Sequence, residues 1–183
     1  MYTCVATLLL RPDLSRSNRF SFKLATVDDA AALAALHTAV AEDLTRLYGV
    51  GTWSTKTSEI GVLYAMRTSR VFVARAGVEI VATLRLATMK PWAIDTRYFS
   101  PCSRPLYLVA MAVTPLRQRQ GFGRRCLEEA TQAARRWPAD AVRLDAFDAD
   151  AGAGGFYARC GWSEVGRTSY RNSRLIYYEF LLK

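Results

Sequence analysis

The chain has 183 residues, of which 51% are hydrophobic and 22% are charged, a composition typical of one globular domain large enough to bury a hydrophobic core. Its formal net charge is +9, which favours an anionic ligand or nucleic acid and otherwise indicates a basic surface facing solvent. Because His37 is the only histidine and no two of the four cysteines form a CxxC pair, the sequence argues against a zinc site and a Ser-His-Asp triad.

Cysteine placement and hydropathy favour a cytoplasmic protein. Cys126 and Cys160 lie in partly apolar helical segments and are predicted to be buried free thiols, as expected in a reducing compartment. Residues 4–10 are apolar but too few to cross a bilayer, and no cationic start precedes them, so a signal peptide is the weaker interpretation. We expect residues 1–19 to form a tail or an extra strand and residues 20–183 to form a single domain.

The first predicted elements are a strand and two helices. Residues 20–24 alternate between apolar and polar side chains, which predicts a strand. Thr26 and Asp29 form a capping-box start for a helix that ends near Gly49 and Gly51. The apolar residues of this helix share one face: Leu33, Leu36, Val40, Leu44 and Leu47. A second, weaker helix is predicted over residues 57–67.

The middle of the chain predicts a β-hairpin and a long connection. Residues 70–75 and 79–86 read as two strands that turn near Gly77. The connection over residues 88–105 is longer than compact domains usually contain without a purpose.

The remaining elements complete a mixed α/β (α+β) sheet with a central βαβ unit flanked by helices. They are a strand at 106–113, a helix at 124–136, a strand at 141–147, a short helix at 151–160 and two final strands at 164–168 and 175–181.

The segment between the strand at 106–113 and the following helix predicts an anion site. It reads Gln118-Arg-Gln-Gly-Phe-Gly123. Glycines let the backbone approach a ligand, and free N–H groups at a helix start point at its phosphates. Four arginines add positive charge: Arg117, Arg119, Arg124 and Arg125. A phosphate-bearing ligand is predicted, and an ordinary tight turn is the structural alternative.

Two other phosphate loops fit less well. No GxxxxGK[ST] string is present, which argues against a Walker A loop. A dinucleotide fingerprint would place Cys126 at its third glycine and Asp145 at its ribose-binding acid. However, residues 114–120 separate the strand from the first glycine, and too few residues follow to build the remaining strands of that fold.

A second motif supports a third interpretation of the loop at 118–123, besides a Walker A loop and a dinucleotide fingerprint. The loop matches the pattern Q/R-x-x-G-x-G/A, and Gly155-Phe-Tyr-Ala-Arg-Cys-Gly-Trp162 matches the F-Y-x-x-x-G-F ending of a fourth helix. On these motifs the chain resembles the GCN5-related N-acetyltransferase (GNAT) family over most of residues 20–183, most strongly from Leu106 to Trp162. The resemblance implies a mostly antiparallel, twisted sheet and an N-acetyltransferase that uses acetyl-CoA as its acyl donor.

The resemblance also implies which residues bind the cofactor. Its pyrophosphate is expected on the loop, over Gln118, Arg119, Gln120, Gly121, Phe122, Gly123 and Arg124. Its pantetheine arm is expected on the main chain of Met111, Ala112 and Val113. Asp150 stands where the family has an asparagine that contacts this arm, and a carboxylate accepts hydrogen bonds but does not donate them.

Tyr157 aligns with the family's tyrosine near the cofactor sulfur, with the implied role of general acid toward the leaving thiolate. The structural alternative is a Phe156–Tyr157 pair that packs the helix on the sheet. Direct attack requires a neutral amine, so a group must accept its proton. The candidates are Asp95, which is the most accessible, Glu79, Asp145, Glu42, His37 and a water chain.

The acceptor is not specified by the sequence. Trp92, Tyr98 and Phe99 of the long connection, with Trp53 facing them, are predicted to wall the acceptor cleft. A connection pinned by its own aromatics and a partner surface are the alternatives. Peptide N-termini, lysines, polyamines, antibiotics and small amines remain open as acceptors.

Two alternatives to an enzyme are a non-catalytic CoA-binding protein and a nucleic-acid-binding protein on the same fold. No RNP-like string or recognition helix is present, so no nucleic-acid partner is expected. No membrane partner is expected either. The final strands are a candidate homodimer interface.

Overall fold

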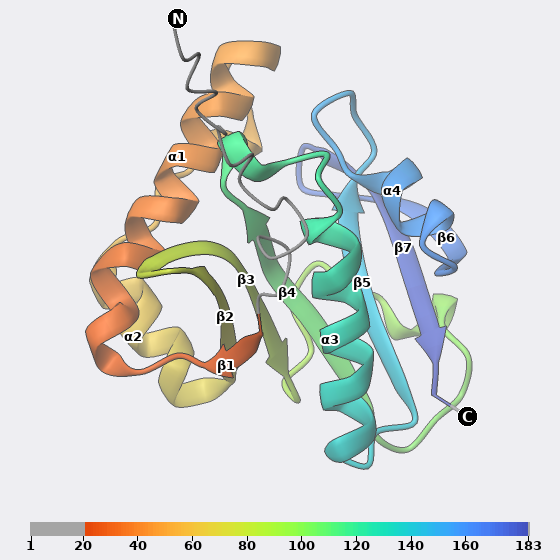
Figure 1. Ribbon diagram of the computed structural model, residues 1–183. Helices are drawn as coiled ribbons and strands as arrows, with labels where there is room; N and C mark the ends of the chain where they lie inside the picture. Colours follow the sequence, from red (N-terminus) through yellow and green to blue (C-terminus); the bar gives the residue numbers. More distant parts are fainter. Residues whose placement is uncertain (1–20, 183) are drawn as a thin grey trace, which may run out of the picture.

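The computed structural model describes residues 21–182, which form a seven-stranded sheet in the order β1-β2-β3-β4-β5-β7-β6 (Figure 1). Its strands are β1 (Phe22–Leu24), β2 (Arg70–Ala76), β3 (Glu79–Ala87), β4 (Pro105–Val113), β5 (Ala141–Phe147), β6 (Ser163–Tyr170) and β7 (Ser173–Leu181). β4 and β5 run parallel, and the other neighbouring strands of this sheet pair antiparallel. The predicted mixed, mostly antiparallel sheet is confirmed. The predicted N-terminal tail and Phe20 lie outside the described residues.

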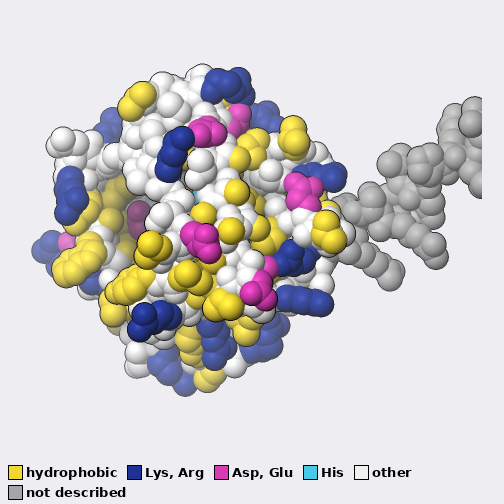
Figure 2. Space-filling model, turned by 90° about the vertical axis from the view of Figure 1, so that its left-hand side faces the viewer, with side chains coloured by type: hydrophobic (Ala, Val, Ile, Leu, Met, Phe, Trp, Pro, Cys, Tyr) yellow, Lys and Arg dark blue, Asp and Glu magenta, His cyan; other side chains and the backbone are white. Residues whose placement is uncertain are grey.

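The helices cover both faces of the sheet. They are α1 (Ala30–Tyr48), α2 (Glu59–Thr68), α3 (Phe122–Arg136) and α4 (Gly154–Arg159). α3 connects β4 to β5 and packs on one face of the central strands, which confirms the predicted βαβ unit. α1 and α2 pack on the opposite face over β2, β3 and β4. Figure 2 shows this second side, where exposed apolar side chains lie among Lys and Arg.

The start of α1 follows the predicted capping pattern. The carboxylate of Asp29 accepts a hydrogen bond from the Thr26 backbone N–H at 2.9 Å, which satisfies a donor at the helix start. Leu33 and Leu36 are then buried against the sheet. Leu47 is 54% exposed, because the C-terminal end of α1 extends beyond the sheet (Figure 1).

The starts of the two shorter helices differ from the predicted positions. α2 begins one residue after Ser58, whose Oγ accepts a hydrogen bond from the Gly61 N–H at 3.1 Å. α4 begins only at Gly154, because the chain first makes a tight turn after β5. In that turn a Cβ on Gly152 would lie 1.8 Å from the carbonyl oxygen of Phe147, so only glycine fits without a backbone shift.

The two cysteines that were predicted to be buried differ from each other in exposure to solvent. Cys126 on α3 is fully buried, as predicted, and burial raises the pKa of its thiol to about 12. Cys160, which follows α4, is only half-buried. A protonated, enclosed thiol is a packing group, because the thiolate is the reactive form.

The long connection between β3 and β4 lies on the sheet. Its Ile94 and Phe99 are buried together with Tyr177 of β7. The Tyr177 hydroxyl donates a hydrogen bond to the carbonyl of Ala93 and accepts one from the Asp95 N–H at 3.1 Å. The connection is therefore pinned by its own apolar and aromatic side chains, the first of the two predicted alternatives to a cleft wall.

Candidate functional site

The site is built where β4 and β5 separate. The two parallel strands pair only at three positions, the last of which joins Tyr107 to Arg143. Beyond this point both strands continue, β4 to Val113 and β5 to Phe147, but within the described sheet they no longer pair with each other. The edge of β4 that faces β5 is therefore open to a ligand along the rest of the strand.

A β-bulge interrupts β4 at this opening. Arg85 of β3 pairs with Val109 and Thr83 pairs with Ala112, so that Ala110 and Met111 both lie opposite one residue of β3. Ala110 has a φ of 52°, which is uncommon for a residue other than glycine, and its side chain is exposed in mid-strand. Bulges and unusual backbone angles of this kind are over-represented at functional sites.

A cavity of about 740 Å³ lies beside the bulge, between β4, α1, the start of α3 and α4. We call it the loop cavity. Its lining residues are Val40, Leu44, Met111, Ala112, Val113, Gln118, Arg119, Gly121, Gly123, Arg124, Ala151, Ala153, Phe156, Arg159 and Cys160. Its volume lies in the range of small-molecule and cofactor sites.

The loop before α3 takes a backbone conformation that favours glycine. Gly121 has a φ of 88° and Arg119 a φ of 58°, and α3 begins at Phe122 directly after them. The Gln118 side-chain amide donates a hydrogen bond to the Val113 carbonyl at 3.2 Å, which ties the loop to the end of β4. The first turn of α3 consequently lies beside the loop cavity, which Gly121, Gly123 and Arg124 line, and a helix start favours an anion.

The two loop glycines are needed for different reasons. A Cβ on Gly121 would meet nothing within 4 Å, so its backbone angle is the constraint. A Cβ on Gly123 would lie 3.0 Å from Cζ of Phe156, so the close packing of α3 against α4 is the constraint there. The sequence alone predicts one shared reason for both glycines, namely the space that phosphates need.

Arginines give the loop cavity a positive charge. Arg119, Arg124 and Arg159 line it, and no acidic residue is among its lining residues. The guanidinium of Arg124 donates to the Arg159 carbonyl at 3.3 Å and so holds α3 next to the end of α4. Backbone donors, arginines and an apolar wall together can accept a ligand that carries phosphates at one end and an extended arm at the other.

Most of the predicted cofactor-binding residues lie around the loop cavity. Gln120 and Asp150 are exposed and Phe122 is 5% exposed in the core under α3, and these three are not among its lining residues. Val40 and Leu44 line the cavity although their spacing had indicated only the apolar face of a helix. Phe156, Arg159 and Cys160 also line it, and only their position within the motif at 155–162 could have indicated them.

Tyr157 lies behind the cavity wall that its neighbour Phe156 provides. It is 8% exposed and packs against Phe156 and Tyr178, with ring centroids 5.4 Å away in both cases. Burial raises the pKa of Tyr157 well above its ordinary value, and the nearby carboxylate of Asp145 raises it further. The hydroxyl is therefore protonated across the physiological range.

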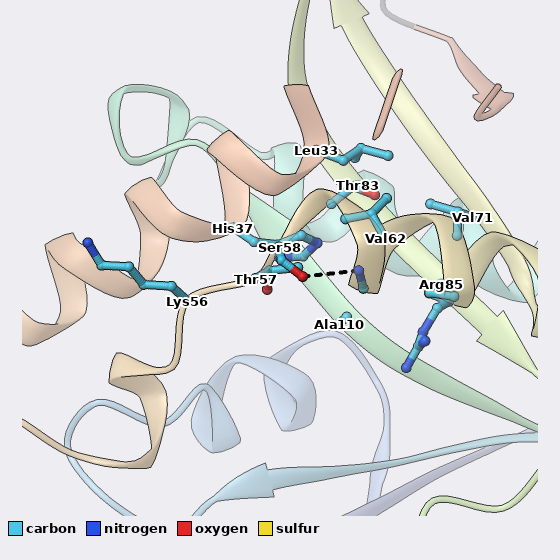
Figure 3. Close-up of a pocket in the computed structure, with 12 residues that line it drawn as sticks. Leu33, His37, Lys56, Thr57, Ser58, Val62, Val71, Thr83, Arg85 and Ala110 are labelled. Atoms are coloured by element: carbon cyan, nitrogen blue, oxygen red, sulfur yellow. Dashed lines mark hydrogen bonds between the residues drawn. The ribbon is translucent and has the colours of Figure 1, made fainter. Parts of the chain in front are cut away.

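A second cavity lies on the opposite side of the bulge, between α1, α2, β3 and β4 (Figure 3). We call it the α1–α2 cavity; its volume is about 360 Å³. Ala110 lines it, whereas the next residue, Met111, lines the loop cavity. The two cavities therefore approach each other across the bulge of β4.

His37 is the one predicted proton acceptor that lines either cavity. It belongs to the α1–α2 cavity, and burial together with the positive charge of Arg85 lowers the pKa of its imidazole. Its ring is therefore neutral at pH 7 and able to accept a proton. Figure 3 shows it close to Thr57 and Ser58.

The predicted carboxylate candidates are less suited to accept a proton. A hydrogen-bonded ion pair with Arg97 lowers the pKa of Asp95 to about 2. Glu42 pairs with Lys56, and Glu79 is exposed at the β2–β3 turn. Burial raises the pKa of the Asp145 carboxyl on β5, but Asp145 is not among the lining residues of either cavity.

The predicted aromatic wall of the acceptor cleft is located elsewhere. Trp92 is 89% exposed, and Tyr98 packs against Tyr177 with ring centroids 5.3 Å apart. Trp53 makes an edge contact with Phe147 at 6.2 Å and lines a separate depression at the end of β5. None of these side chains lines the α1–α2 cavity.

Within residues 21–182, no group of three His, Cys, Asp or Glu side chains is arranged to hold a metal ion. No helix in the same range is both long and apolar enough to cross a membrane.

Comparison with known protein families shows a family whose model matches most of the chain. Residues 34–162 match the model of the acetyltransferase (GNAT) family. A search of curated protein sequences returned no match.

Solved structures with the same fold include yncA of Salmonella typhimurium with its cofactor acetyl-CoA, at 15% identity and a TM-score of 0.65 over 91% of this chain and 95% of that one. A GNAT-family acetyltransferase from Listeria monocytogenes superposes with a TM-score of 0.69 at 15% identity over 89% of this chain and 95% of that one. A ribosomal-protein-alanine N-acetyltransferase from Brucella melitensis gives 0.66 at 17% identity, over 88% and 99% of the two chains.

Proposed function

The chain belongs to the GNAT acetyltransferase family and is an acetyl-CoA-dependent N-acetyltransferase, and from that premise we propose that it acetylates an amine that enters the α1–α2 cavity. The observation that supports this proposal is that two neighbouring residues of the β4 bulge line different cavities, Ala110 the α1–α2 cavity and Met111 the loop cavity. One has the basic loop and helix start that suit acetyl-CoA, and the other offers a separate entrance for the amine.

The loop cavity fits the cofactor on its own features. The pyrophosphate would lie on the N–H groups that follow Gly121, with Arg119 and Arg124 adding positive charge. The edge of β4 at Met111–Val113, which does not pair with β5, offers main-chain hydrogen bonds to an extended arm. Bound acetyl-CoA supplies an activated thioester; the residues of the chain position it and handle protons.

We propose a direct transfer without a covalent enzyme intermediate. The N–C bond forms as the C–S bond breaks, one proton passes from the amine to the imidazole of His37, and one proton reaches the departing sulfur. A main-chain N–H at the bulge would stabilise the developing oxyanion. Tyr157 remains our candidate for the second proton, since its hydroxyl is protonated and it directly follows Phe156 of the cavity wall. Its raised pKa makes it a weak acid, so the transfer requires the departing sulfur to come within hydrogen-bond distance of the hydroxyl.

The central test combines binding and turnover. Calorimetry should show that the full chain binds acetyl-CoA, and CoA thiol release should then depend on an added amine. Folded protein that neither binds acetyl-CoA nor releases thiol with any amine would refute the proposed function.

Replacing Gly121 by alanine should weaken acetyl-CoA binding. Its φ of 88° costs an L-residue about 1–2 kcal/mol, and relaxation of that strain would turn the N–H groups at the start of α3 away from the ligand. Gly77→Ala is a matched control, because Gly77 has a φ of 63° and equally open surroundings in the β2–β3 turn.

Both glycine variants should lose similar stability in chemical denaturation, whereas calorimetry should show weaker acetyl-CoA binding only for Gly121→Ala. Equal affinities in the two variants would remove the loop from the binding site.

Tyr157→Phe should lower kcat by roughly 10²-fold or more if the hydroxyl protonates the departing sulfur. Acetyl-CoA affinity should change little, because Tyr157 is not among the residues that line the loop cavity. Single-turnover measurements at saturating acetyl-CoA isolate the chemical step. An unchanged rate would assign Tyr157 to packing in the cluster with Phe156 and Tyr178.

A further inference from the structure

The α1–α2 cavity contains positive charge that the chain does not neutralise. Its ionisable lining residues are His37, Lys56 and Arg85, and no Asp or Glu is among its lining residues. Lys56 pairs with Glu42 at 2.6 Å, and Figure 3 shows its side chain extending away from the other labelled residues. With His37 neutral at pH 7, the uncompensated charge of the cavity is the guanidinium of Arg85.

Arg85 lacks a partner at a buried donor. Its Nε is shielded from solvent and has no hydrogen-bond partner among the described residues. Burial lowers the pKa of the guanidinium, and no neighbouring carboxylate opposes that shift. Because buried donors in folded proteins are nearly always satisfied, an orphaned arginine N–H at a cavity wall indicates a ligand group.

The position of Arg85 places that ligand group next to the proposed reaction centre. Arg85 pairs with Val109 in the register of β3 and β4, and Ala110 of the bulge follows Val109. Figure 3 shows the Arg85 side chain running from β3 toward β4, across the cavity from His37. An anion bound to Arg85 and an amine aimed at the bulge would therefore both lie in the α1–α2 cavity, which Arg85 and Ala110 line together.

We propose that the acceptor is a small amine that carries a carboxylate close to its amino group, as an α-amino acid does, and that Arg85 binds this carboxylate. This inference rests on the proposed function. The planar fork of a guanidinium matches the two oxygens of a carboxylate, which gives orientation as well as affinity. The cavity of about 360 Å³ suits a small molecule. Polyamines and aminoglycosides are disfavoured, because their positive charges would face Arg85.

Matched acceptors test the proposal on the wild-type chain. The common α-amino acids and their carboxamides are compared by CoA thiol release, together with putrescine as a cationic acceptor. At least one amino acid should be acetylated with a kcat/KM roughly 10- to 100-fold higher than its carboxamide, the range expected for hydrogen bonds to a charged group. Each carboxamide keeps the carbon skeleton and the amine but replaces the carboxylate by a neutral amide, and the lower pKa of its amine, which leaves more neutral amine at pH 7, works against the expected preference.

A variant pair locates the effect. Arg85→Gln should abolish the preference for the acid over its carboxamide while acetyl-CoA binding by calorimetry is retained. Arg67→Gln is the control, because Arg67 is an exposed arginine in the last turn of α2 that is not among the lining residues. It should keep the wild-type preference.

The outcomes separate the inference from the proposed function. Acetylation of carboxamides or putrescine at rates equal to or above those of the acids would overturn the inference and leave the acetyltransferase intact. The same holds if acetyl-CoA binds but no acid of the panel is acetylated. A preference that survives Arg85→Gln would overturn the role of Arg85. If Arg85→Gln does not fold, the wild-type comparison of acids and carboxamides still decides the substrate class.

Discussion

At pH 7 the His37→Gln variant is expected to acetylate its acceptor roughly 10²–10⁴-fold more slowly than the wild type, the range for loss of a general base. Glutamine keeps a similar size and polarity but cannot take up the amine proton. His37 is the one predicted proton acceptor that lines a cavity, and its imidazole is neutral because burial and Arg85 lower its pKa. The measurement is kcat/KM from CoA thiol release at saturating acetyl-CoA.

The pH dependence gives a second readout. A base acts only when it is unprotonated, so the rate should rise with pH through the pKa of His37 and then become level. Because that pKa lies below the ordinary value of 6.5, the rising part of the pH–rate profile should lie below pH 6.5. This rise should be absent in His37→Gln. Arg85→Gln should move the rise to higher pH, because it removes a nearby positive charge.

Acetyl-CoA affinity provides the control for this variant. His37 does not line the loop cavity, so calorimetry should give the wild-type dissociation constant. If both the rate and the pH profile are unchanged, the base is another group. Asp145 is then the next candidate, since burial raises the pKa of its carboxyl above its ordinary value.

Replacing Glu179 by alanine is expected to lower the free energy of unfolding by about 3–5 kcal/mol, because it leaves a buried charge without a partner. Glu179 and Arg143 form an ion pair at 2.9 Å, with side chains only 3% and 5% exposed. Glu179 also accepts a hydrogen bond from the Ser100 N–H at 3.2 Å, and Arg143 donates to the Ser100 carbonyl. The pair thus joins β5, β7 and the long connection behind the open edge of β4.

Chemical denaturation of matched variants measures this effect. Glu164→Ala removes one partner of the exposed pair with Arg167 and should change the unfolding free energy little. The double variant Arg143→Met with Glu179→Leu removes both charges and should recover most of the loss. A Glu179→Ala variant as stable as Glu164→Ala would show that the buried guanidinium is not left uncompensated.

The residues around the loop cavity were largely predictable, because their signals are local. The loop 118–123 and the motif 155–162 each lie within a few residues, and their glycines report backbone geometry directly. The structure places eight of the predicted residues on the loop cavity: Met111, Ala112, Val113, Gln118, Arg119, Gly121, Gly123 and Arg124. The start of α1 was predictable for the same reason, since Thr26 and Asp29 are close in sequence.

The surroundings of the α1–α2 cavity were not predictable in this way. Asp95 was predicted as the most accessible base, yet its ion pair with Arg97 lowers the pKa of its carboxyl. The aromatic connection was expected to wall a cleft, yet it packs on β7 through Phe99. Nothing in the sequence pointed to Arg85, because the buried Nε without a hydrogen-bond partner becomes visible only in the folded structure.

The sequence by itself therefore determined the order of strands and helices, the basic glycine loop and the tyrosine motif, and with them the family. Only the tertiary structure decided where β4 and β5 stop pairing, that Ala110 bulges between two cavities, and that His37 and Arg85 share one of them. The physical reason is that hydrogen-bonding patterns within a turn or a helix depend on neighbouring residues, whereas a cavity and its net charge depend on which distant side chains the packed sheet brings together.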